Sequence, residues 1–150
     1  MPPVSRFRSA SDGRAMDVVW APKAASTAIA LNTLLTLDTT NGRLTPAVTA
    51  SLFVVGVSMS TILSTDPNFA TTEEIQYDAA RDGDEFIMAV DSAVTAGFVP
   101  GVERSIVTAS QIRAAAPGAG QPRLVRVKRV LLATNQAVVE LITNADSQNI

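Results

Sequence analysis

Short apolar runs rich in branched residues, each closed by a turn signal, constrain the fold of this 150-residue chain more than any other feature. Val, Ile and Thr suit the pleated, half-buried surface of a strand, and short runs of them between turn residues are typical of strands. The period of an amphipathic helix is almost nowhere sustained. The pattern therefore predicts at least six strands and a mostly β protein, either a small β-barrel or a β-sandwich.

The expected strands are separated by recognisable turns. The clearest turn spans residues 38–42, because Asn41 and Gly42 both tolerate positive φ. Residues 52–59 are apolar on both faces and predict a central strand, in which Gly56 marks a bulge or a close backbone approach. Residues 102–116 fit either one short helix or two strands. The expected strands are residues 28–31, 34–37, 44–48, 52–59, 73–77, 85–90, 94–98, 123–132 and 137–142.

The chain divides into three segments. Residues 1–25 contain several prolines and small polar residues without a sustained period, and they predict an extended N-terminal arm. Residues 26–143 form the expected β-barrel or β-sandwich domain, and the polar residues 144–150 predict a flexible C-terminal tail. The only tryptophan, Trp20, lies in the arm segment. It can anchor an interface, or it can close the core of its own domain.

Histidine and cysteine are both absent, which removes several kinds of catalytic chemistry. Neither a Ser-His or Cys-His nucleophile pair nor a zinc site with His and Cys ligands can form. Gly118 and Gly120 are not followed by the lysine and hydroxyl residue of a phosphate-binding loop, and no serine lies in a nucleophile elbow. We therefore expect no enzymatic activity, no catalytic residue, no cofactor and no metal.

An acidic cluster is the one feature that supports an alternative to a protein without catalytic or metal sites. Paired carboxylates can act as acid and base in glycoside hydrolysis, and carboxylates can also bind calcium. Residues 78–85 lack the spacing of a calcium loop, so a solvated acidic turn is favoured. The alternatives are a cation site or an enzyme that uses Asp82, Asp84 or Glu85. The cluster consists of Glu73, Glu74, Asp78, Asp82, Asp84, Glu85 and Asp91.

Basic residues gather in the segment 123–129. A nucleic-acid-binding chain should carry a basic excess, whereas the formal net charge is −2, and no aromatic residue follows Phe98 to stack on bases. We expect a salt-bridged protein contact instead, and no nucleic-acid partner. The candidate protein-interaction residues of the arm and of this basic segment are Arg6, Phe7, Arg8, Trp20, Arg123, Arg126, Lys128 and Arg129.

Residues 44–65 carry no charge and require comparison with a membrane span. A span needs about 20 predominantly apolar residues. This stretch is interrupted by many Ser and Thr residues and by Pro46, so buried strands are favoured and no membrane partner is expected.

Three segments carry a resemblance to a known family. They are LFVVGVSMS at residues 52–60, DEFIMAVDSAVTAGFVPG at 84–101 and RLVRVKRVLLATNQAVVELI at 123–142. With an arm before a β domain rich in Ala, Val and Thr, the layout of residues 27–142 resembles the head-decoration, or capsid cement, proteins of tailed bacteriophages.

The resemblance implies a small, β-tulip-like barrel that clamps neighbouring subunits of the major capsid protein on the outside of the virion. It also implies a homo-oligomer, with a trimer as one form. The alternatives are a tail or neck component of a phage, or a non-catalytic surface β domain that acts in assembly.

Overall fold

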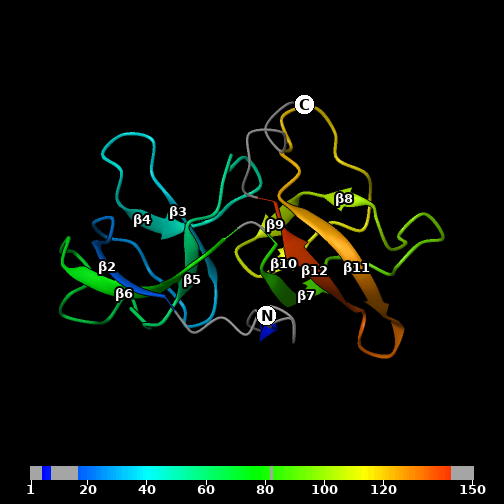
Figure 1. The fold of residues 1–150 in the computed structure, drawn as a ribbon. Helices are drawn as coiled ribbons and strands as arrows, with labels where there is room; N and C mark the ends of the chain where they lie inside the picture. The colour runs from blue at the N-terminus through cyan, green and yellow to red at the C-terminus, as the bar shows by residue number, and fades with distance from the viewer. Residues whose placement is uncertain (1–4, 8–16, 82, 143–150) are drawn as a thin grey trace.

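The computed structural model describes residues 5–7, 17–81 and 83–142, and this part of the chain is almost entirely β. It contains no α-helix, and its one helical element is a 3-10 turn, η1 (Leu132–Thr134). The mostly β class predicted from the sequence is confirmed. The strands form two sheets, which lie side by side as two lobes (Figure 1).

The first sheet curls into a nearly closed barrel. Its strands are β1 (Ser5–Phe7), β7 (Glu85–Val90), β8 (Glu103–Arg104), β9 (Ile106–Thr108), β10 (Gln111–Ile112), β11 (Val125–Leu131) and β12 (Gln136–Leu141). They follow the order β8-β11-β12-β7-β10-β9, and β1 pairs with β7 beside this path. The end strands β8 and β9 are separated in the chain only by Ser105, so the chain itself joins the two edges. The barrel alternative predicted from the sequence describes this lobe.

The second sheet is antiparallel throughout. Its strands are β2 (Val18–Pro22), β3 (Leu34–Leu37), β4 (Leu44–Pro46), β5 (Gly56–Ser58) and β6 (Glu74–Ala79), in the order β2-β6-β5-β3-β4. Directly after β2, Lys23 forms a parallel bridge with Leu44 of β4. This bridge brings the two edge strands together, so the second sheet also curves round its own small core.

Strand β3 lies between two hydrophobic cores. Leu34 packs in the barrel core with Phe86, whereas Leu35 packs in the core of the second sheet with Ile75. Both leucines are completely buried because successive side chains of a strand point to opposite faces. The Leu34 N–H also donates to the carbonyl oxygen of Ala109 in the barrel at 2.9 Å. The two lobes are therefore joined through β3, and Val57 of β5 also packs in the barrel core.

Several predicted strands are confirmed. β3 and β7 have the predicted bounds, and the hairpin of β11 and β12 closes at Asn135, which adopts a φ of 51°. The ambiguous residues 102–116 form the short strands β8, β9 and β10 rather than a helix. In the longer barrel strands, alternate residues pack in the barrel core, as Phe86, Met88 and Val90 do on β7.

Two predicted strands are wrong, and a third is shorter than expected. Residues 28–31 make only one isolated bridge, at Ile29, and residues 94–98 form a turn. Of residues 52–59, only β5 is a strand. The apolar run before β5 is instead divided between the cores, because Val54 packs in the barrel core and Val55 against the smaller one.

Of the uncharged residues 44–65, only β4 and β5 form the predicted strands, and turns and loops make up the rest. In the described ranges of the chain, no helix is both long and apolar enough to cross a membrane.

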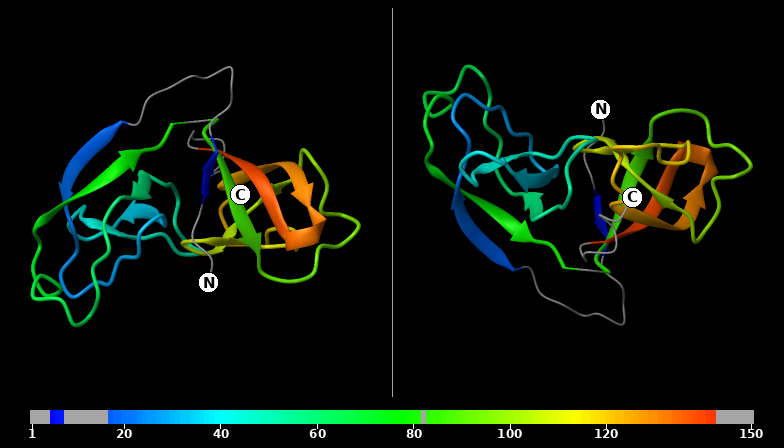
Figure 2. Two further views of the ribbon diagram at one scale, coloured as in Figure 1. Left: turned by 90° about the horizontal axis from the view of Figure 1, so that it is seen from below. Right: turned by 90° about the horizontal axis from the view of Figure 1, so that it is seen from above.

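The segment predicted as an arm, residues 1–25, contains sheet strands. β2 pairs along its whole length with β6, because Ala21 on its inner face helps to complete the smaller core. β1 pairs with the first half of β7, and these two strands run antiparallel (Figure 2). β2 and β6 are also antiparallel. Arg8 and the predicted tail at residues 144–150 lie outside the described residues.

Lys23 is completely buried, although the sequence analysis did not single it out. Its Nζ donates to the carbonyl oxygens of Phe69 and Thr71 at 2.8 Å each, and to that of Ala24 at 3.2 Å. Three acceptors match the three N–H groups of an ammonium. Burial lowers the pKa of Lys23, and the nearby charge of Glu73 opposes this shift. The side chain ties the loop before β6 to the end of β2.

Substitution of Lys23 tests this role. Lys23→Met keeps the aliphatic stem but leaves the carbonyl groups of Phe69 and Thr71 without their donor, so we expect a loss of about 2 kcal/mol in the free energy of unfolding. Lys128→Met, at an exposed ion pair, should change it by less than about 1 kcal/mol. Urea denaturation measures both. An unchanged or higher stability for Lys23→Met would contradict the role.

Gly56 lies at a close approach of β5 to β6, as the sequence predicted. A Cβ at this position would collide with the carbonyl oxygen of Asp78 and with the ring of Tyr77. Only a residue without a side chain fits between these strands.

Gly56→Ala should therefore lower the free energy of unfolding by about 3 kcal/mol, because backbone atoms of β6 must move. The matched control is Gly97→Ala, whose added Cβ would meet no heavy atom within 4 Å. Thermal unfolding of the two variants makes the comparison. Equal melting temperatures would show that β5 and β6 can separate without cost.

Candidate protein-interaction surfaces

Strand β2 exposes an apolar stripe at the outer edge of the second sheet. Val18, Trp20 and Pro22 alternate with the more protected Val19 and Ala21, and 58% of Trp20 is exposed. Trp20 therefore does not close the core of its own chain. An exposed tryptophan on a rigid strand has the properties of an interface anchor, although this role stays a prediction.

A second apolar surface lies just after β4, where the two lobes meet. One groove of about 440 Å³ is lined by Ile29 and Ile62 of the second lobe and by Val107 of the barrel. Another, of about 470 Å³, is lined by Leu37 and Leu52. The two grooves share Pro46 and Val48, so they form one continuous surface.

The large side chains of this surface are exposed. The exposed fraction is 56% for Val48, 55% for Leu63 and 50% for Leu52. We call the surface formed by Pro46, Val48, Leu52 and Leu63 the Val48 surface. Sequence reasoning missed it because it assigned Val48 and Leu52 to strands, whereas both lie in connections between strands. A continuous exposed apolar surface is typical of a contact site.

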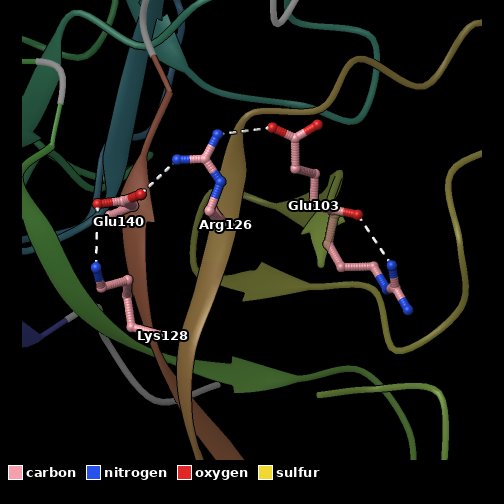
Figure 3. Close-up of polar contacts among 5 residues, drawn as sticks. Glu103, Arg126, Lys128 and Glu140 are labelled. Atoms are coloured by element: carbon pink, nitrogen blue, oxygen red, sulfur yellow. Dashed lines mark hydrogen bonds and ion pairs between the residues drawn. The ribbon is translucent and has the colours of Figure 1, made fainter. Parts of the chain in front are cut away.

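The predicted basic segment lies on the outer face of β11, and part of its charge is neutralised within the chain. Arg126 forms ion pairs with Glu103 of β8, at 3.0 Å, and with Glu140 of β12. Lys128 lies 3.6 Å from the same Glu140 (Figure 3). The hydrogen bond with Glu140 is the main cause that raises the pKa of Arg126. These four side chains hold three neighbouring strands of the barrel together.

The other two basic residues of this segment, Arg123 and Arg129, differ from Arg126 and Lys128 in their contacts. Pairing with β12 shifts between Val127 and Arg129, which leaves Lys128 as the extra residue of a bulge and exposes both Lys128 and Arg129. Within residues 17–81 and 83–142, neither Arg123 nor Arg129 forms an ion pair. Arg123 and Arg129 therefore carry the charge that is available to a partner.

Arg104 is a second buried cation that the sequence analysis did not identify. Its guanidinium donates to the carbonyl oxygens of Ala114 at 3.1 Å, Glu103 at 2.9 Å and Gly97 at 3.3 Å, and it lies 5.7 Å from the centre of the Phe98 ring. Burial lowers the pKa of Arg104. These contacts fasten two loops at one end of the barrel, so Arg104 has a structural role.

The acidic residues 78–85 do not form the solvated turn that was favoured. Asp78 is buried in β6 and accepts from the N–H of Asp17 at 3.0 Å, and Asp84 is buried and accepts from the N–H of Arg81 at 2.9 Å. These carboxylates complete backbone hydrogen bonding where the chain crosses between the sheets. No group of three or more potential metal ligands occurs among the residues described, and Asp82 is outside them.

Comparison with known proteins adds no relative. No protein-family model matches the sequence, and no curated protein is significantly similar to it. The fold and surfaces define an all-β protein with a barrel-like sheet, a second sheet and exposed apolar side chains.

Glu140→Gln tests whether internal pairing masks the basic segment. The change removes the carboxylate charge that Arg126 and Lys128 share, so cation-exchange retention should increase more than in Glu74→Gln, which makes the same charge change at an exposed site on β6. The free energy of unfolding should fall by less than about 1 kcal/mol, because these ion pairs are half exposed. Equal retention of the two variants would show that Arg126 and Lys128 were already available.

Proposed function

We propose that the protein is a structural component of a bacteriophage virion that binds the outside of the capsid and stabilises contacts between subunits of the major capsid protein. The observation that carries the proposal is the exposure of large apolar side chains, Trp20 on β2 and the Val48 surface, on a chain whose two cores are already filled. The layout resembles that of capsid cement proteins, and this resemblance is the reason for proposing the major capsid protein as the partner.

The apolar surfaces supply the binding energy in this proposal. Trp20 projects from an edge strand, and a tryptophan that becomes buried at an interface commonly contributes a large share of the affinity. The Val48 surface offers a concave site between the lobes for an apolar side chain of the neighbour. Both surfaces belong to strands or to loops packed against them, so little order has to be gained on binding.

In this proposal, basic side chains orient the protein on the capsid. Arg123 and Arg129 are free to meet acidic groups of the capsid, and Arg126 and Lys128 keep the barrel face rigid through Glu103 and Glu140. The arm residues Arg6, Phe7 and Arg8 complete the proposed contact set. Complementary charge chiefly improves the rate and specificity of association.

The same surfaces fit assembly of several copies, so a homo-oligomer, with a trimer as one form, is part of the proposal. A tail or neck component is the second candidate, because exposed apolar side chains on a rigid β scaffold serve any such contact. Catalysis, a nucleic-acid partner and a membrane partner are not part of either version.

Imaging of particles from the native source separates these candidates. Density for the two-lobed fold on the outer surface of the capsid, over contacts between major capsid subunits, is expected. Density at the neck or tail would favour the second candidate, and particles without the protein would contradict both.

Trp20→Ala tests the apolar anchor. We expect binding to capsids that lack the protein to weaken by about tenfold or more in co-sedimentation, since an anchoring tryptophan typically contributes more than 1 kcal/mol. The matched control is Leu132→Ala in η1, because Leu132 is also a large exposed side chain, at 75%, but lies on the barrel outside both surfaces. Equal binding of the two variants would rule out Trp20 as the anchor.

A further inference from the structure

The two edges of β7 are occupied differently. Along one edge, β12 pairs with β7 continuously from Glu85 to Ala89. Along the other edge, β10 pairs only with Ala89 and Val90. Among the described strands, β1 pairs with the first half of that second edge, Glu85–Ile87, in the register Ser5↔Ile87, Arg6↔Phe86 and Phe7↔Glu85. The barrel thus has a gap three residues long that a short extended strand fills.

The strand that fills this gap is attached to the other sheet. β1 is followed by β2, which pairs with β6 in the second sheet. Residues 8–17 join β1 to β2, whereas the opposite crossing from β6 to β7 uses only residues 80–84, so the N-terminal crossing is the longer of the two. At about 3.3 Å per residue, such a connection can span on the order of 30 Å. A connection of this length can reach a neighbouring subunit.

We propose that the edge of β7 at Glu85–Ile87 is a strand-accepting site that binds Ser5–Phe7 of a second copy, so that neighbouring subunits exchange β1. The main-chain pairing is the same whether the strand comes from the same chain or from another, because the register involves only the two strands themselves. Exchange of an identical element is a low-cost route to an oligomer. The inference concerns contacts between copies and does not depend on capsid binding.

The absence of cysteine from the natural chain makes a direct test possible. Ser5 and Ile87 face each other in the register, and opposite residues of antiparallel strands have Cβ atoms close enough for a disulfide. We would prepare Ser5→Cys and Ile87→Cys as separate proteins of different mass, unfold and refold them together at high concentration, and oxidise the mixture. A disulfide between the two variants requires β1 of one chain to lie on β7 of the other.

The expected result is a covalent heterodimer of Ser5→Cys with Ile87→Cys, at several times the yield obtained when Ser64→Cys replaces Ser5→Cys. Ser64 is exposed in a loop of the second lobe and makes a matched control. The double variant Ser5→Cys/Ile87→Cys reports the pairing within one chain.

Two results would overturn the proposal. If the double variant forms only an internal disulfide and the mixture forms no heterodimer, β1 stays on its own barrel. If neither preparation forms the disulfide, β1 does not occupy this edge at all. Neither result bears on binding to the capsid, which the Trp20→Ala comparison measures.

Discussion

The structure depends on one short strand that is buried on both faces. Leu34 and Leu35 are adjacent in β3, yet one belongs to the barrel core and the other to the core of the second sheet. Neither sheet is large, and aromatic residues make up only 5% of the chain, so each core consists mainly of aliphatic groups. Sharing β3 lets two small cores support each other, and the bond from the Leu34 N–H to Ala109 sets the position of one lobe against the other.

Buried cations hold the irregular parts of this framework. Lys23 collects carbonyl groups at the edge of the second sheet, and Arg104 does the same at one end of the barrel. Each replaces the backbone pairing that short strands cannot provide, since buried carbonyl groups need donors. With the loops fixed in this way, the apolar side chains left outside, Trp20 and the Val48 surface, are held in defined positions on the surface.

The sequence predicted what depends on local pattern. Alternating branched residues and the Asn135 turn predicted β7 and the terminal hairpin, and Gly56 predicted a close approach of strands. Burial of Lys23 was not predictable, because its acceptors Phe69 and Thr71 lie 46 and 48 positions away in the chain. The partial neutralisation of Arg126 likewise depends on Glu103 and Glu140 from two other strands. Only the register of the sheet brings such groups together.

Because β3 contributes to both cores, we expect the two sheets to unfold as one cooperative unit. Native-state hydrogen exchange tests that account most directly. If β3 joins the cores, the amides of β6 in the second sheet and of β12 in the barrel should open together, with the same free energy and the same dependence on denaturant. Exchange of one sheet at a clearly lower free energy than the other would show two independent units and would contradict the account.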